Sequence, residues 1–135
     1  MKKMALDYGD IRIGIATSDA LGMIASGLET YVRKSEEQDI LHIVSLIEQY
    51  KIDTVVIGLP LKMDGTEGHR AEVTRAFGEQ LQKHTAVKIV YQDERLSSVS
   101  AEEILIEGNM RREKRKLVID QLAAAIILQS YLDRF

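Results

Sequence analysis

Apolar positions in the first quarter of the chain follow the pattern of β-strands. Residues 3–8 and 11–17 are two apolar runs separated by Gly9-Asp10, which is a tight-turn signal. Residues 25–32 form a third strand pattern, weaker than the first two. Because no helical pattern lies between these runs, they predict an antiparallel meander of three strands.

After residue 34 the pattern alternates between helices and strands. The predicted elements are a helix opened by the capping box Ser35-Glu36-Glu37-Gln38, a strand over 53–58, a helix with Val73, Phe77 and Leu81 on one stripe, a strand over 87–92, a helix over 99–107 that stops at Gly108-Asn109, and a last helix over 117–133. Strands that alternate with helices pair in parallel through right-handed crossovers. The whole pattern therefore predicts an α/β fold, with a mixed five-stranded sheet flanked by helices.

Composition narrows the class of protein. The chain has 135 residues, of which 45% are hydrophobic and 29% charged, so we expect one globular domain over 1–135. It contains no Cys, which excludes disulfides and thiolate metal sites. No apolar run approaches the length of a membrane helix, and Lys2-Lys3 leads directly into a strand pattern without a signal-peptide core. We expect a cytoplasmic protein with no membrane partner.

Asp7 is the first candidate for a functional residue. It lies within an apolar strand pattern, and a buried carboxylate costs several kcal/mol unless it is paired or holds a metal. The alternative interpretation is that Asp7 caps a turn or pairs with Arg12.

Two further acidic positions stand out. Asp93-Glu94 follows the last predicted strand, and Asp120 lies near the start of the last predicted helix among apolar residues. If these acids converge with Asp7, they form an oxygen-only site that suits Mg²⁺ or Mn²⁺. The alternatives are an Asx turn at Asp93, a Glu94–Arg95 pair, and an Asp120 that complements a helix dipole in its first turn.

Candidate phosphate contacts lie in two segments. The loop over 64–68 includes Gly65 and Gly68, whose backbones can approach a phosphate closely, although it also fits an ordinary strand-to-helix loop. The run from Arg111 to Lys116 has five cations in six residues. Its alternative is a solvated loop and helix start. A net charge of −3 argues against nucleic-acid binding by the whole surface but does not exclude a local basic patch.

Four motifs follow one another along nearly the whole chain: Leu6-Asp7-Tyr8-Gly9 with Arg12-Ile13-Gly14-Ile15-Ala16 and Ser18-Asp19, Gly58-Leu59-Pro60-Leu61 with Asp64-Gly65, Asp93-Glu94-Arg95-Leu96, and Asp120-Gln121-Leu122-Ala123-Ala124. In these motifs the chain resembles the YqgF-type Holliday-junction-resolvase-like nucleases, also described as pre-16S ribosomal RNA nucleases. Ser97-Ser98 stands where that family has Thr-Thr, a departure that leaves the acids in place.

The resemblance implies a ribonuclease H-like fold and an acidic triad of Asp7, Glu94 and Asp120, which prefers Glu94 over Asp93. It implies a metal-dependent endonuclease that matures the 5′ end of pre-16S ribosomal RNA. Two other hypotheses remain: a dimeric resolvase of branched DNA, and a factor that binds the ribosomal precursor particle with little nuclease activity. Actin-like ATPases and sugar kinases share the Asp-x-Gly opening but need a second domain, for which 135 residues leave no room. The expected substrate contacts are Arg12, Gly65, Arg112, Lys114, Arg115 and Lys116.

Overall fold

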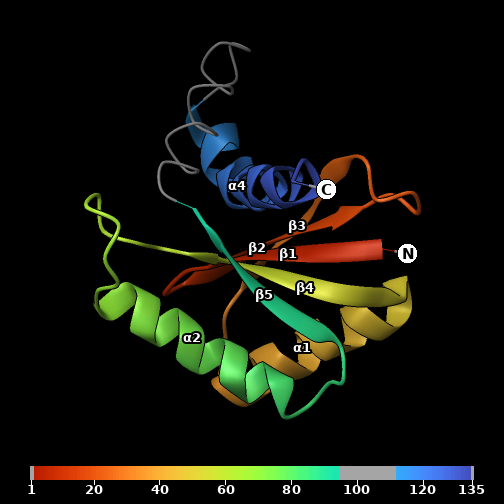
Figure 1. The fold of residues 1–135 in the computed structure, drawn as a ribbon, viewed down its shortest axis with the longest axis horizontal. Helices are drawn as coiled ribbons and strands as arrows, with labels where there is room; N and C mark the ends of the chain where they lie inside the picture. The colour runs from red at the N-terminus through yellow and green to blue at the C-terminus, as the bar shows by residue number, and fades with distance from the viewer. Residues whose placement is uncertain (1, 95–111, 135) are drawn as a thin grey trace.

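A five-stranded mixed sheet forms the centre of the molecule (Figure 1). The computed structural model describes residues 2–94 and 112–134, with residues 112–117 described by their backbone only. The strands are β1 (Lys2–Tyr8), β2 (Arg12–Ser18), β3 (Ala25–Val32), β4 (Ile52–Leu59) and β5 (Lys88–Asp93). The described helices are α1 (Glu36–Tyr50), α2 (His69–Gln82) and α4 (Arg112–Leu132).

The strand order, β3-β2-β1-β4-β5, confirms the predicted topology. β1, β2 and β3 pair in antiparallel fashion, whereas β4 and β5 run parallel to β1. The single-domain prediction over 1–135 and the helix expected over 99–107 extend over residues outside the described part of the chain.

One boundary differs clearly from the prediction. The last helix begins at Arg112 and not near residue 117. Arg, Glu and Lys are good helix formers, and no Gly or Pro interrupts residues 112–116, so the basic run is helical instead of being a loop before the helix. No described helix is both long and apolar enough to cross a membrane.

Helices cover both faces of the sheet, α1 and α2 on one side and α4 on the other (Figure 1). Side chains alternate along β1, so that Met4, Leu6 and Tyr8 pack in the larger core with α1 and α2, while Ala5 packs against α4. The α4 side is lined by small residues, including Ala5, Ala16 and Ala124, which let the helix approach the sheet closely. Asp7, two residues after Ala5, therefore faces α4.

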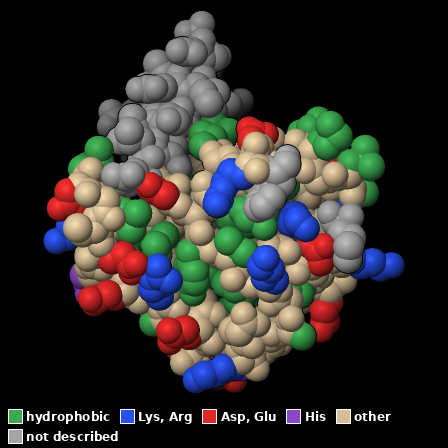
Figure 2. Space-filling view, viewed as in Figure 1, with side chains coloured by type: hydrophobic (Ala, Val, Ile, Leu, Met, Phe, Trp, Pro, Cys, Tyr) green, Lys and Arg blue, Asp and Glu red, His purple; other side chains and the backbone are tan. Residues whose placement is uncertain are grey.

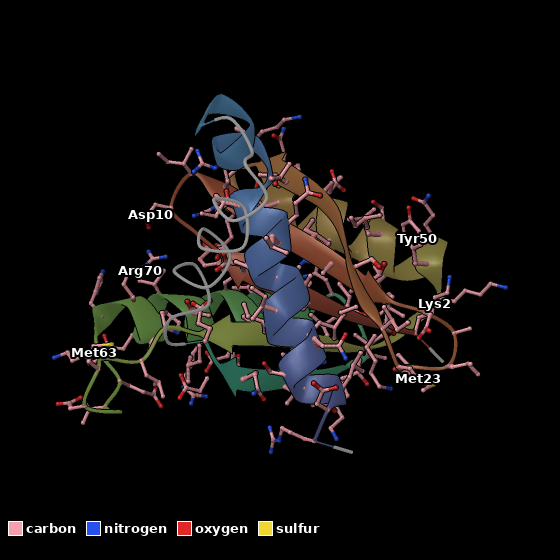
Figure 3. The ribbon with its side chains drawn as sticks, turned by 90° about the horizontal axis from the view of Figure 1, so that it is seen from above. Lys2, Asp10, Met23, Tyr50, Met63 and Arg70 are labelled. Carbon is pink, nitrogen blue, oxygen red and sulfur yellow. The ribbon has the colours of Figure 1, made fainter. Side chains whose placement is uncertain are left out.

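The two ends of the sheet are different in character. Exposed apolar side chains gather near the β2–β3 turn, where Leu21, Met23 and Ile24 are largely accessible (Figure 2). Asp10, Met63 and Arg70 lie at the opposite end (Figure 3). That end holds the β1–β2 turn and the carboxyl ends of β4 and β5, the edge at which parallel α/β sheets bind their ligands.

A buried ion pair fixes the β1–β2 turn to the start of α1. The fully buried Asp39 accepts from Arg33 Nε at 3.0 Å and from the backbone N–H of Lys34 at 2.9 Å. Arg33 also donates to the carbonyl of Gly9 at 3.1 Å and stacks over the ring of Tyr8, 4.6 Å from its centroid. The pair thus holds the chain directly after Asp7.

Asp39→Ala should lower the free energy of unfolding by about 3 kcal/mol, because it leaves the Arg33 charge without its buried partner. Denaturant unfolding of both proteins measures the difference. Glu37→Ala, in the same helical turn but exposed, is the control and should cost less than about 1 kcal/mol. Equal losses in the two variants would mean that the ion pair does not anchor the turn.

Candidate active site

Asp7 lies between two glycines on the neighbouring strands. Gly14 of β2 is its antiparallel partner. On the other side, the pairing of Leu6 with Ile57 places Gly58 of β4 next to Asp7. Glycine inside a strand often marks a close approach by another group, and two such positions flank this carboxylate.

Each glycine leaves room for another acidic residue. A Cβ on Gly58 would lie 2.8 Å from Glu94 Oε2, and also 2.6 Å from Ile127 Cδ1 of α4. A Cβ on Gly14 would lie 2.0 Å from the backbone oxygen of Asp120 and 3.0 Å from its Cβ. The two glycines therefore allow Glu94 and Asp120 to approach Asp7. The sequence analysis did not identify either glycine as a site residue. Their signal was a lone glycine within a strand pattern.

Asp7 and Glu94 share a hydrogen bond, in which the Glu94 carboxyl is the donor. Burial, the negative charge of Asp7 and this hydrogen bond raise the pKa of Glu94 to about 9. Burial also raises the pKa of Asp7, an effect increased by Asp120 and opposed by Glu94 and Arg70. The two acids therefore lie side by side with a proton between them.

The structure distinguishes Glu94 from Asp93. Asp93 is the last residue of β5 and its side chain is exposed, whereas Glu94 is half-buried and its backbone N–H bonds to the carbonyl of Leu59 at 3.2 Å. The negative charge of Asp93 is one of the causes that raise the pKa of Glu94. Glu94 is thus the acid that reaches Asp7.

Asp120 lies close enough to repel the Asp7 carboxylate, but it has a partner of its own. Arg12 Nε donates to Asp120 Oδ2 at 2.6 Å. Arg12 is thus a partner of Asp120, whereas the alternative interpretation paired it with Asp7. Because α4 begins at Arg112, Asp120 lies in the third turn, so the interpretation as a first-turn dipole partner is wrong.

Asp7 and Glu94 are in contact, with Asp120 held beside them by Arg12. Within the described residues, no three acidic or histidine side chains are arranged so that they could hold a metal ion without adjustment. The donor set itself fits a hard divalent cation, since it consists of carboxylates that repel one another. Loading a cation would replace the shared proton and loosen the Arg12–Asp120 pair.

Arg70 is a site residue that the sequence analysis missed. It is the second residue of α2, and its positive charge lowers the pKa of both Asp7 and Glu94. Its Nη2 donates to the carbonyl of Tyr8 at 3.1 Å, and its Nη1 pairs with Asp10. A single arginine in a helix start has no distinguishing pattern in the sequence, so only the fold reveals it.

Of the remaining residues predicted to contact the substrate, the structure places only Gly65 in full. Gly65 lies in an exposed turn after β4 and adopts a left-handed φ of 88°. Met63, two residues earlier, lies at the same end of the sheet as Asp10 and Arg70 (Figure 3). The side chains of Arg112, Lys114, Arg115 and Lys116 lie outside the described residues, as do Ser97 and Ser98.

Comparisons with known proteins show the family of the chain. A family model described as "RuvX: Holliday junction resolvase" matches residues 1–134. A Halothermothrix orenii protein named "Putative pre-16S rRNA nuclease" is 51% identical over 133 residues, which cover 98% of this chain and 95% of that protein. A Carboxydothermus hydrogenoformans protein of the same name is 48% identical, covering 98% of this chain and 96% of that protein.

Solved structures share the fold at low sequence identity. T. thermophilus RuvC in complex with a Holliday junction substrate has a TM-score of 0.60 and 13% identity, covering 99% of this chain and 95% of that one. The fowlpox virus resolvase in complex with Holliday junction DNA has a TM-score of 0.62 and 11% identity, covering 99% and 98%. These neighbours confirm the predicted ribonuclease H-like, RuvC-like architecture of the sheet and helices.

The contribution of the Asp7–Glu94 pair to the stability of the metal-free protein should fall as pH rises. The pKa of Glu94 is raised from 4.5 to about 9, so the stabilisation by its shared proton is complete below about pH 4.5 and is lost as pH approaches 9. Glu94→Gln keeps a hydrogen-bond donor without the charge. At pH 9 in a chelator, its Tm should therefore exceed that of the wild type by about 4 °C or more, and the gap should close at pH 5.

The control for this series is Glu48→Gln, the same substitution on the exposed face of α1. Its Tm should follow the wild-type curve across the pH range. A Glu94→Gln curve parallel to the wild type would mean that the two carboxylates do not share a proton.

Proposed function

We propose the function of this chain from one premise: it belongs to the RuvX family. The proposed activity is that of a nuclease that hydrolyses phosphodiester bonds in the 5′-end maturation of pre-16S ribosomal RNA, with a divalent cation, Mg²⁺ or Mn²⁺. The observation that carries the proposal is the hydrogen-bonded pair of Asp7 and Glu94, with Asp120 beside it. The names of relatives that are about half identical over nearly the whole chain support the substrate.

Asp7, Glu94 and Asp120 would hold the cation. When bound, it would polarise a phosphodiester and stabilise the charge that develops on its oxygens during hydrolysis. Glu94 would have to lose the proton that it shares with Asp7 in order to hold a cation as a carboxylate. Arg12 donates to one oxygen of Asp120, Oδ2, so it orients this carboxylate as well as neutralising it.

The substrate would be held around this site by cationic side chains and a glycine backbone, of which Arg12 also orients Asp120. Arg12 and the backbone at Gly65 belong to this proposed set, together with the cations of the first turns of α4: Arg112, Lys114, Arg115 and Lys116. Such contacts to phosphates position a nucleic acid without reading its sequence.

A second candidate is a resolvase that acts on branched DNA as a dimer. The shared fold with two structures solved on Holliday junctions favours it. Resolving a symmetric junction takes two cuts, so this function needs two sites related by a two-fold axis. Solution mass and cleavage of a pre-16S fragment beside a four-way junction distinguish the two functions.

Asp7→Asn should reduce cleavage by about 100-fold or more, because it removes a charge that holds the cation while keeping the side-chain volume. Cleavage of a pre-16S 5′ fragment should require Mg²⁺ or Mn²⁺ and stop in a chelator. Ca²⁺, which is larger and accepts irregular coordination, should support binding of the fragment but little cleavage.

Asp120→Asn in the same four conditions tests the third acid. A wild-type protein that binds the fragment in every condition and cuts it in none would instead be a factor that binds the ribosomal precursor. Cleavage by Asp7→Asn at the wild-type rate would exclude the acidic site.

Glu94→Gln should cost far more activity than Asp93→Asn, the matched change at the neighbouring residue. Glu94 contacts Asp7, whereas the Asp93 side chain is exposed. We expect a loss of about 100-fold for Glu94→Gln and less than about threefold for Asp93→Asn in single-turnover cleavage. The reverse order would assign the second acid to Asp93.

A further inference from the structure

A hollow that includes Lys62 and Arg70 in its lining lies between the end of β4 and the start of α2. Its volume is about 350 Å³, and the described residues that line it are Pro60, Leu61, Lys62, Gly68, His69 and Arg70. We call it the β4–α2 hollow. Arg70 marks it at the same end of the sheet as Asp10 (Figure 3).

The described lining of the hollow contains no carboxylate. The acids of the adjoining loop have other partners. Glu67 forms a two-pronged bond with Arg75, at 2.7 and 2.9 Å. Asp64 accepts from the backbone N–H and the hydroxyl of Thr66, at 2.9 and 2.6 Å. The positive charges of the lining are those of Lys62 and Arg70, on otherwise largely apolar walls, and Arg70 shares its charge with Asp10.

Lys62 is held over the hollow by local structure. The turn that contains it is closed by bonds from Lys62 N to Thr66 O and from Gly65 N to Lys62 O, both 2.8 Å. Its side chain lies against Gly68, where a Cβ would come within 2.7 Å of Lys62 Cε. Neither Lys62 nor His69 forms an ion pair with any residue that the structure describes. Among the described residues, no carboxylate therefore occupies their polar groups.

Arg70 joins the hollow to the acidic pair. The same guanidinium that lines the hollow bonds to the carbonyl of Tyr8, the residue after Asp7, and attracts the carboxylates of Asp7 and Glu94. These bonds use two of the five N–H donors of an arginine. Between a phosphate in the hollow and the pair of Asp7 and Glu94 would therefore lie the side chain of Arg70.

We propose that the β4–α2 hollow binds a single backbone phosphate of the nucleic-acid substrate, next to the one that is cut, and so sets the position of cleavage. This inference rests on the proposed function. A nucleic acid is the ligand class favoured here, because its phosphates follow one another along the strand. A strand with one phosphate at the acids necessarily brings the next one near.

The first test is binding in Ca²⁺ of two probes, a hairpin RNA with a single-stranded 5′ extension and a four-way DNA junction. Lys62→Gln should weaken binding of the true substrate about 5- to 10-fold and reduce the slope of log K against log salt by about 0.7–0.9, the value for one phosphate contact. The matched control is Lys83→Gln, at the far end of α2 and exposed, which should stay within about twofold of the wild type.

The second test replaces single phosphates of the better probe by neutral methylphosphonates, one position at a time. In the wild type, one linkage next to the cleavage position should weaken binding about 5- to 10-fold when neutralised. In Lys62→Gln this loss should disappear at that linkage and persist at the others. In Arg70→Gln, too, neutralising that linkage should no longer weaken binding, whereas neutralising the others still should.

The results separate this inference from the nuclease activity. If the wild type cuts neither probe but Lys62→Gln loses a position-specific contact, the hollow binds a phosphate, whereas the nuclease proposal and the role of the hollow in setting the cleavage position are wrong. If the wild type cuts a probe while Lys62→Gln binds it with an unchanged salt slope, the hollow is wrong and the nuclease stands. Failure of the wild type to bind either probe would overturn both.

Discussion

Two carboxylates with a single proton between them are the constraint around which this end of the molecule is arranged. Asp7 and Glu94 repel each other when both are ionised, and burial makes that repulsion stronger. Neighbouring arginines offset this negative charge. Arg70 lies close enough to attract both acids, and Arg12 neutralises Asp120 on the far side. In the absence of a cation, the proton and the two arginines keep the cluster folded.

The backbone around these acids is as specialised as the side chains. Gly14 and Gly58 flank Asp7 on the two adjacent strands, and a Cβ on either would collide with the approaching acid or with α4. The opposite face of the same strands is filled by large residues such as Leu6 and Ile57. One face of the three central strands thus packs in the larger core, and the other leaves the space in which the acids lie.

Much of this arrangement could be predicted from the sequence, since it depends on local patterns. Alternating apolar residues predicted the strands, and the absence of a helix between the first three predicted their antiparallel pairing. The position of Asp7 within an apolar strand identified the first acid. The choice of Glu94 over Asp93 came from the family resemblance, because the two acids are neighbours at the end of one strand and the sequence does not show which of them is buried. Arg70 could not be found, because its role arises from contacts with residues far away in the chain.

The C-terminal helix has a consequence for how the protein is made. Asp7 lies on the first strand to be synthesised, whereas Asp120 lies on the last described helix, which packs across β1, β2 and β3. The other face of the sheet can be covered by α1 and α2 earlier, while the α4 face is still bare. During translation, therefore, the three acids cannot meet until the final helix has left the ribosome. A chain without α4 would have Asp7 on an uncovered face of the sheet, with no Asp120 beside it.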